Sequence, residues 1–219
     1  MCIRDRGSMG GLISLKRREC HFTGTHLLDE ETGEYNIPFI KRILSGESLI
    51  VINLVYRQQG LMVRKGNPKG IKGFEDLVRE DVVFVNRQRG SGTRLLLEKE
   101  LREHGIEPSR IKGYDMEDFT HMAVASKIAK GVADTGLGIY SAAKAFDLDF
   151  IPVTEERYDI VILEEHLELP FIVEILKIIR EDQEFRKAVL NLGGYDIRDM
   201  GKVIIQTLPL KGLSESAAL

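Results

Sequence analysis

Two long extended passages, residues 48–64 and 150–163, most constrain what this 219-residue chain can fold into. Both are rich in β-branched residues, which favour strands, and a break in the first is expected around Arg57 to Gly60. Between them, residues 73–149 contain a self-sufficient series of strand-like and helix-like segments. Strands that alternate with helices of about a dozen residues predict parallel sheets built from βαβ units. The chain is therefore expected to have an α/β fold with two lobes.

The same passages set the expected lobe boundaries. Residues 7–72 and 150–202 are assigned to lobe one, residues 73–149 to lobe two, and residues 203–219 to a tail. Two lobes that are connected by two extended segments of the chain leave a cleft between them. Residues 1–6, with the sequence MCIRDR, match no periodic element and are interpreted as a foreign leader.

Composition narrows the class of protein. Hydrophobic residues make up 43% and charged residues 30% of the chain, as in ordinary soluble domains. The net charge of -3 indicates no general affinity for nucleic acid. No apolar run is long enough for a membrane span, which needs about 18 residues. Cys2 and Cys20 make neither a disulfide framework nor a metal cluster. Because the N-terminus also lacks the apolar core of a signal peptide, a cytoplasmic location is expected.

The stretch from Gly90 to Thr93 joins a strand-like run to a helix-like run, which is expected from Thr93 to His104 and is ended by Gly105. The first N–H groups of a helix have no partner inside it, and the helix dipole places partial positive charge there. Such a turn favours an anion, and Ser91 adds a hydroxyl donor. Alternatively, Ser91 only caps the helix while Gly90 shapes the loop.

Several other kinds of site are excluded by pattern. A Walker A loop needs Lys after Gly92, and a dinucleotide fingerprint needs Gly where Leu95 stands. His26 and Asp29 lack a third ligand at useful spacing, so a structural or cleft-rim role is expected for them, and His121 is interpreted as a capping or packing residue. No Ser–His–Asp or Cys–His constellation is present. The sequence therefore predicts neither a metal site nor a cofactor site, and no enzyme activity.

A set of motifs between Gly7 and about Lys202 carries a family resemblance. The motifs are GSMGGL, GTHLLDEETGEYN, QGLMVRKGNP, FVNRQRGSGTR, THMAVA, ADTGLGI and EERYDIVI. Together they resemble the cytoplasmic periplasmic-binding-protein-like domain of molybdate-related proteins. In that family the domain is fused to a helix-turn-helix regulator or to a molybdopterin biosynthesis enzyme. The resemblance implies a type II periplasmic-binding-protein-like fold, with two α/β lobes around a central cleft. It also implies N-terminal truncation, because the family's domain begins with an earlier strand, ligand-binding loop and helix.

The resemblance further implies a site in which hydroxyls and helix N-termini from both lobes hold an oxyanion. The residues it places there are Ser8 and Met9 from lobe one, Ser91, Gly92 and Thr93 from lobe two, the amides of Gly136, Leu137 and Gly138, and Tyr158 at a hinge. Arg87 and Arg89 are expected to add positive charge. The alternatives are a helix cap at Ser8, a packed core tyrosine at Tyr158, and surface ion pairs for the two arginines.

The expected function is that of a sensor domain for a small anion such as molybdate, tungstate or a molybdenum-cofactor-related ligand. Its partner is expected to be a fused helix-turn-helix or molybdopterin biosynthesis domain, with no nucleic acid and no membrane bound by this domain itself. A LysR-like effector domain for an organic acid is the nearest alternative. An enzyme on the same scaffold, and a degenerate domain that only mediates assembly, are two others. In every binding hypothesis, Ser8 and Thr93 are expected to face each other across the cleft.

Overall fold

The computed structural model describes residues 7–207; the expected leader, residues 1–6, and the end of the expected tail, residues 208–219, lie outside this range. The helices are α1 (Gly7–Lys16), α2 (Ile37–Ile43), α3 (Gly92–Glu103), α4 (His121–Ala129), α5 (Tyr140–Ala145), α6 (Pro170–Glu181) and α7 (Gln183–Leu192). The strands are β1 (Phe22–Thr25), β2 (Leu49–Val63), β3 (Asn86–Arg87), β4 (Glu117–Asp118), β5 (Thr135–Ile139), β6 (Asp149–Leu163), β7 (Tyr195–Asp196) and β8 (Val203–Gln206).

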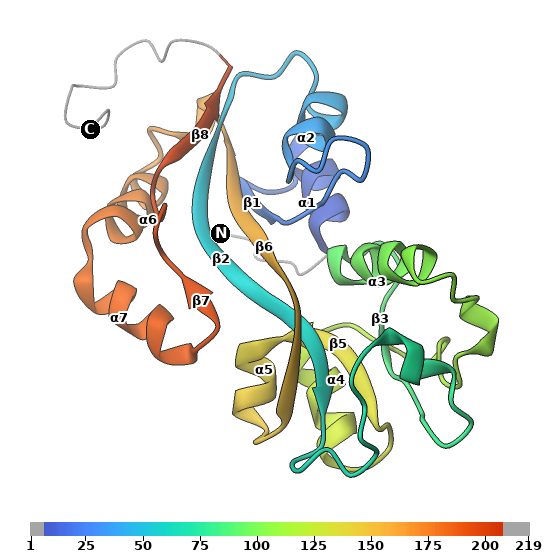
Figure 1. Ribbon diagram of the computed structural model, residues 1–219. Helices are drawn as coiled ribbons and strands as arrows, with labels where there is room; N and C mark the ends of the chain where they lie inside the picture. The colour runs from blue at the N-terminus through green and yellow to red at the C-terminus, as the bar shows by residue number, and fades with distance from the viewer. Residues whose placement is uncertain (1–6, 208–219) are drawn as a thin grey trace.

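Strands β2 and β6 run side by side through the length of the molecule (Figure 1). Each has 15 residues, and they pair antiparallel from Leu49–Leu163 to Val63–Asp149. They form the centre of a sheet with the order β1-β6-β2-β5, in which β7 and β8 also pair with β2. Their two ends enter different groups of helices, so this strand pair is the connection between the lobes.

The strand directions differ from those predicted. All the strand ladders in the main sheet are antiparallel; within residues 7–207, parallel pairing is seen in the short β3–β4 ladder and in an isolated bridge between Phe84 and Thr135 of β5. The expectation of parallel βαβ sheets is therefore wrong for the main sheet. Alternating strands and helices also arise when long antiparallel strands pass between lobes, and the amphipathic pattern of a strand carries no information about its direction.

Strand β2 is also continuous where a break was expected. It pairs with β6 on one edge throughout, with a bulge between Gln59 and Gly60. On the other edge Arg57 pairs with Tyr195. Arg57 and Gln59 are buried in spite of their polarity, because both side chains meet Glu156 of β6. The polar segment of β2 thus marks a buried contact in the strand, not its end.

Each lobe has its own hydrophobic core. In lobe one, α1 and α2 cover one face of the sheet and α6 and α7 cover the other, as Figure 1 shows. Leu61, Val63 and Ile71, which the sequence placed in lobe one, pack instead with Phe84 and Leu97 in the core of lobe two. The boundary between the cores therefore lies within β2 and β6 instead of at residues 72 and 150.

The first part of the expected tail is structured. Residues 203–206 form β8, which pairs with Ile50, Val51 and Ile52 of β2. Assigning these residues to the tail is therefore wrong. Their run of apolar residues, with Ile204 and Ile205 packed against the lobe-one core, explains why the chain returns to the sheet here.

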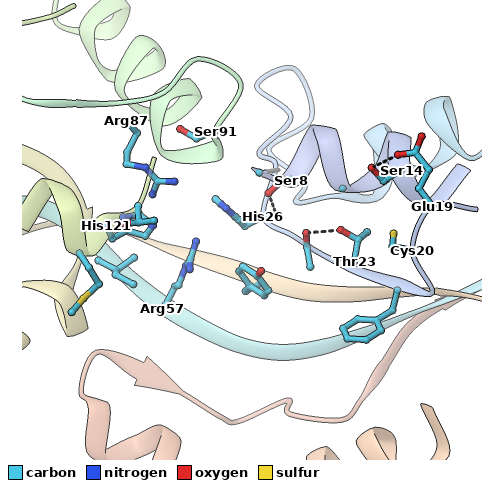
Figure 2. A pocket seen from close by; sticks show the side chains of 18 of the residues that line it. Ser8, Ser14, Glu19, Cys20, Thr23, His26, Arg57, Arg87, Ser91 and His121 are labelled. Carbon is cyan, nitrogen blue, oxygen red and sulfur yellow. Dashed lines mark hydrogen bonds between the residues drawn. The ribbon is translucent and has the colours of Figure 1, made fainter. Parts of the chain in front are cut away.

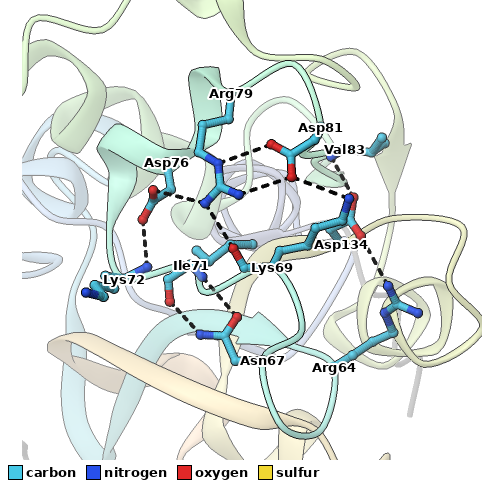
Figure 3. A network of polar contacts seen from close by, with 10 residues as sticks. All are labelled: Arg64, Asn67, Lys69, Ile71, Lys72, Asp76, Arg79, Asp81, Val83 and Asp134. Carbon is cyan, nitrogen blue, oxygen red and sulfur yellow. Dashed lines mark hydrogen bonds and ion pairs between the residues drawn. The ribbon is translucent and has the colours of Figure 1, made fainter.

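A polar network closes the loop that follows β2 (Figure 3). Arg79 donates to Asp76 at 3.3 Å and to Asp81 at 3.1 Å. Asp134 accepts a hydrogen bond from the backbone N–H of Val83 at 2.9 Å. These contacts fix the chain just before β3, and so help to position the lobe-two residues that face the cleft.

Candidate functional site

A cavity of about 760 Å³ lies where the two lobes meet (Figure 2). Lobe one contributes α1 and the segment around β1, the connecting strands contribute one side chain each, and lobe two contributes the segments at β3, α3, α4 and β5. The lining residues are Gly7, Ser8, Gly11, Ser14, Glu19, Cys20, His21, Phe22, Thr23, Gly24, His26, Arg57, Arg87, Ser91, Thr120, His121, Met122, Ile139 and Tyr158.

One end of the cavity is rich in cationic and imidazole side chains. Figure 2 shows Arg57, Arg87, His26 and His121 gathered there. Arg57 comes from β2, Arg87 from β3, and His121 from the first position of α4. Because no acidic side chain of residues 7–207 lines this end, it favours an anion. We call these four residues the cationic end.

A buried carboxylate behind the cavity wall holds two of these side chains. Glu156 is 2% exposed; it accepts hydrogen bonds from Arg57 and Gln59, and its Oε2 lies 3.1 Å from Nδ1 of His26. Burial acts to raise the pKa of Glu156, but the charges of Arg57 and His26 outweigh it and hold this pKa well below its usual range. Glu156 therefore stays ionised and fixes Arg57 and His26 in place.

Two groups at the cationic end have buried nitrogen atoms without partners. Nη2 of Arg57 and Nδ1 of His121 have no hydrogen-bond partner among the residues the structure describes. Burial and the nearby charges of Arg57 and Arg87 lower the pKa of His121 well below its ordinary value, so its imidazole is neutral at pH 7. A buried N–H donor without a partner is costly, and an anion at this end would accept from Nη2 of Arg57; in the neutral His121, one ring nitrogen is a donor and the other an acceptor.

Hydroxyl groups from both lobes reach the same cavity. The hydroxyl of Ser8 accepts from the backbone N–H of His26 at 3.2 Å, and the hydroxyl of Ser91 accepts from the N–H of Arg94 at 3.2 Å. A serine hydroxyl that accepts still has a proton to donate. Ser91 is thus the N-cap of α3 and also lines the cavity. Helix capping and ligand contact, which the sequence left as alternatives for this residue, are therefore compatible.

The other residues proposed from the sequence are placed in four different ways. Met9 packs against the lobe-one core, and Leu137 lies in the lobe-two core beside Gly136. Gly92 and Thr93 are buried behind the cavity wall, and Arg89 is exposed, 3.8 Å from Glu117. None of these side chains lines the cavity. Ser8 and Ser91 therefore line the cavity together, whereas Thr93, which was expected to face Ser8 across the cleft, does not line it. Gly138 pairs with Gly60 in the sheet.

Three of the four residues of the cationic end were not proposed as ligand contacts from the sequence. They are Arg57, His26 and His121. A signal for Arg57 was present, since a charged residue inside an apolar, β-branched run must find a buried partner. His26 was assigned to a structural or rim position and His121 to capping or packing, because their neighbours in space are far away in sequence.

Gly92 sets how closely the two lobes approach. A Cβ atom at this position would lie 2.4 Å from Nδ1 and 2.9 Å from the backbone oxygen of His26. Since the backbone cannot swing aside, we expect Gly92→Ala to lower the free energy of unfolding by about 1–3 kcal/mol, as overpacking does. Urea denaturation measures this change; a loss below about 0.5 kcal/mol would show that the lobes separate freely here.

Within residues 7–207, no group of three or more His, Cys, Asp or Glu side chains is arranged to hold a metal ion. In the same range, no helix is long and apolar enough to cross a membrane.

Comparisons with known proteins agree with this architecture. YvgK of Bacillus subtilis, an uncharacterised protein, is 41% identical over 202 residues, which are 92% of this chain and 65% of YvgK. The chain thus spans less than two thirds of that relative. A Clostridium perfringens protein crystallised with bound phosphate superposes with a TM-score of 0.57 at 16% identity, over 85% of this chain and 83% of that one. The regulatory domain of CcmR from Synechocystis PCC6803, in complex with 2-PG, gives a TM-score of 0.56 at 14% identity, over 84% and 81% of the two chains.

At sequence identities this low, the two solved structures support only the fold. The sequence itself matches the PBP superfamily domain over residues 2–180, which is most of the chain. This chain belongs to the PBP superfamily and has the α/β fold of type II periplasmic binding proteins.

Proposed function

We propose that this domain binds a small anionic ligand in the cleft between its lobes, without catalysis. The observation that carries the proposal is the cationic end, where Arg57, Arg87, His26 and His121 come from four separate segments of the chain and line one cavity. Ser8 and Ser91 add hydroxyl donors from opposite lobes. Oriented neutral donors together with a few charges are well suited to an oxyanion group.

The volume of the cavity favours a ligand larger than a free oxyanion. About 760 Å³ lies within the range of pockets for organic ligands, about 300–1,000 Å³. An organic acid that carries a carboxylate or phosphate group fills more of this space than molybdate or tungstate would. This supports the effector-domain alternative, in which the ligand is an organic acid. Molybdate and tungstate remain the ligands that the motif resemblance suggests.

Closure of the cleft is the proposed output. A ligand that touches both lobes binds better when the lobes are together, and so shifts the population toward the closed form. Arg102 of α3 pairs with Glu30 of lobe one, a contact that exists only when the lobes are close. We propose that closure reports to a fused helix-turn-helix or molybdopterin biosynthesis domain in the cytoplasm, with no nucleic acid or membrane bound by this domain itself.

Isothermal titration calorimetry of the 219-residue protein tests this proposal. The panel consists of molybdate, tungstate, sulfate, phosphate, hexanoate and shikimate. We expect saturable binding of at least one of these anions with a Kd below about 1 mM, a standard free energy of about -4 kcal/mol. The absence of saturable binding for all six anions would overturn the proposal.

A further inference from the structure

We infer that the ligand of this cleft is an amphiphilic organic acid, whose apolar chain runs from the cationic end over Met122 and outward along Phe119. The inference rests on the proposed function and adds the chemical class of the ligand's body. It starts from two apolar side chains at the edge of the cavity. Phe119 is 73% exposed and Met122 is 48% exposed, and Met122 lines the cavity.

The path of the chain places this pair of residues beside the cationic end. Strands β3 and β4 are parallel, so their carboxyl ends meet at one edge, where ligands of α/β folds bind. Nη2 of Arg87 in β3 donates a hydrogen bond to the backbone oxygen of Phe119, just after β4, at 2.8 Å. Thr120 and His121, the next two residues, both line the cavity, and Met122 follows them. Figure 2 shows Arg87 and His121 close together at this end.

The fold itself does not use the two apolar side chains. Phe119 comes directly before Thr120, the N-cap of α4, where an apolar residue often packs against the fourth residue of the helix. That residue is Val124, which is buried in the lobe-two core, whereas Phe119 remains exposed. Within residues 7–207, neither Phe119 nor Met122 belongs to a hydrophobic core. Their apolar surface is therefore available to a molecule outside the fold.

Neither lobe closure nor a second protein explains this exposure. The lobes already meet, since a Cβ on Gly92 would lie 2.4 Å from His26 and Arg102 pairs with Glu30, yet Phe119 stays 73% exposed. Two side chains also fall far short of the roughly 800 Å² that each partner of a stable protein complex buries. A small ligand anchored at the adjacent cationic end fits both observations.

An apolar wall connects the cationic end to this rim. Ile139, at the end of β5, lines the cavity together with Met122. A Cβ on Gly138 would lie 3.5 Å from Nδ1 of His121, so this end of β5 borders the cationic end. A chain of methylene groups next to the anionic group would cover Ile139 and Met122, which a compact oxyanion leaves in water.

Four carboxylates of equal charge test the apolar chain in calorimetric titrations of the protein: butyrate, hexanoate, octanoate and 2-(2-ethoxyethoxy)acetate. A fully buried methylene group raises affinity about fourfold, and we expect about twofold for each one at this open rim. Octanoate should therefore bind about fifteenfold more tightly than butyrate, with hexanoate between them. The ether acid has the chain length of octanoate but two polar oxygen atoms, so it should bind about tenfold more weakly than octanoate.

Removing the two apolar side chains provides the decisive variant. In the double variant Phe119→Ser, Met122→Ser, the ratio of octanoate to butyrate affinity should fall below about threefold, while butyrate affinity changes by less than about twofold. The control is Val132→Ser, Leu190→Ser, which removes two apolar side chains that are 53% and 47% exposed outside the cavity and should keep the ratio. Circular dichroism confirms that both proteins are folded.

The outcomes separate this inference from the proposed function. If butyrate binds but octanoate binds no more tightly, or if the Phe119 and Met122 double variant keeps the ratio, the apolar chain is overturned while anion binding stands. The same holds if molybdate or phosphate binds and none of the carboxylates does. A wild-type dimer that this double variant converts to a monomer in sedimentation would show that a second copy covers the pair, and would also overturn the inference. If no anion binds at all, the proposed function itself fails.

Discussion

Replacing Glu156 by Gln is expected to lower the free energy of unfolding by about 3–5 kcal/mol, the usual cost of removing one partner from a buried ion pair. Arg57 and Glu156 have side-chain exposures of 10% and 3%, so the substitution leaves a buried guanidinium without its counter-charge. The amide of Gln keeps the shape of the side chain, so the loss reports the charge and not a cavity. Chemical denaturation monitored by circular dichroism measures it.

The adjacent residue of β6 provides a matched control. Glu155 is 43% exposed and pairs with the exposed Arg198. Exposed pairs contribute about 0–1 kcal/mol, so Glu155→Gln should change stability by no more than that. Equal losses in the two variants would contradict the view that the Arg57–Glu156 pair is a buried structural centre of the site.

The same pair gives the protein a specific response to acid. The pKa of Glu156 is held below its ordinary value in the folded protein, whereas the unfolded value is about 4.3. The stabilisation is therefore complete above about pH 4.3 and is lost as the pH falls further. Glu156→Gln should show a smaller loss of stability than the wild type between about pH 5 and pH 3.

The second large effect concerns ligand affinity. We expect Arg87→Gln to weaken the binding of phosphate and hexanoate ten- to a hundredfold, because a hydrogen bond to a charged group contributes about 1.5–3 kcal/mol. Arg87 lines the cavity, and its guanidinium is oriented by a 2.8 Å hydrogen bond to the backbone oxygen of Phe119. Gln retains some polarity at the site but removes the positive charge.

Arg89→Gln is the control for this variant. Its side chain is 79% exposed and does not line the cavity, yet the substitution removes the same charge from the same loop. Affinity should change by less than about threefold, or 0.6 kcal/mol. If both variants weaken binding equally, the effect is one of general charge, and the assignment of Arg87 to the site is wrong.

Local features of the fold could be predicted from the sequence. Helix α3 was expected from Thr93 to His104 and is observed from Gly92 to Glu103, with Ser91 as its N-cap. These expectations succeeded because capping and helix-ending signals are carried by residues close in sequence.

What could not be predicted depends on long-range pairing. A break in β2 was expected around Arg57 to Gly60, where the apolar run is interrupted, but pairing with β6 carries β2 through these residues. Likewise, the contact between His26 and Glu156 joins residues 130 positions apart. That Arg57, His26 and His121 line one cavity became evident only once the lobes were placed together.

The most direct test of the account is the location of a bound oxyanion in a crystal. Crystals of the protein grown with molybdate would be measured at the molybdenum absorption edge, where the anomalous signal locates the metal atom of the anion. We predict a peak inside the cavity, with oxygen atoms of the anion about 2.7–3.2 Å from the guanidinium nitrogen atoms of Arg57 or Arg87. Peaks found only outside the cavity would contradict the claim that the cleft holds the anion.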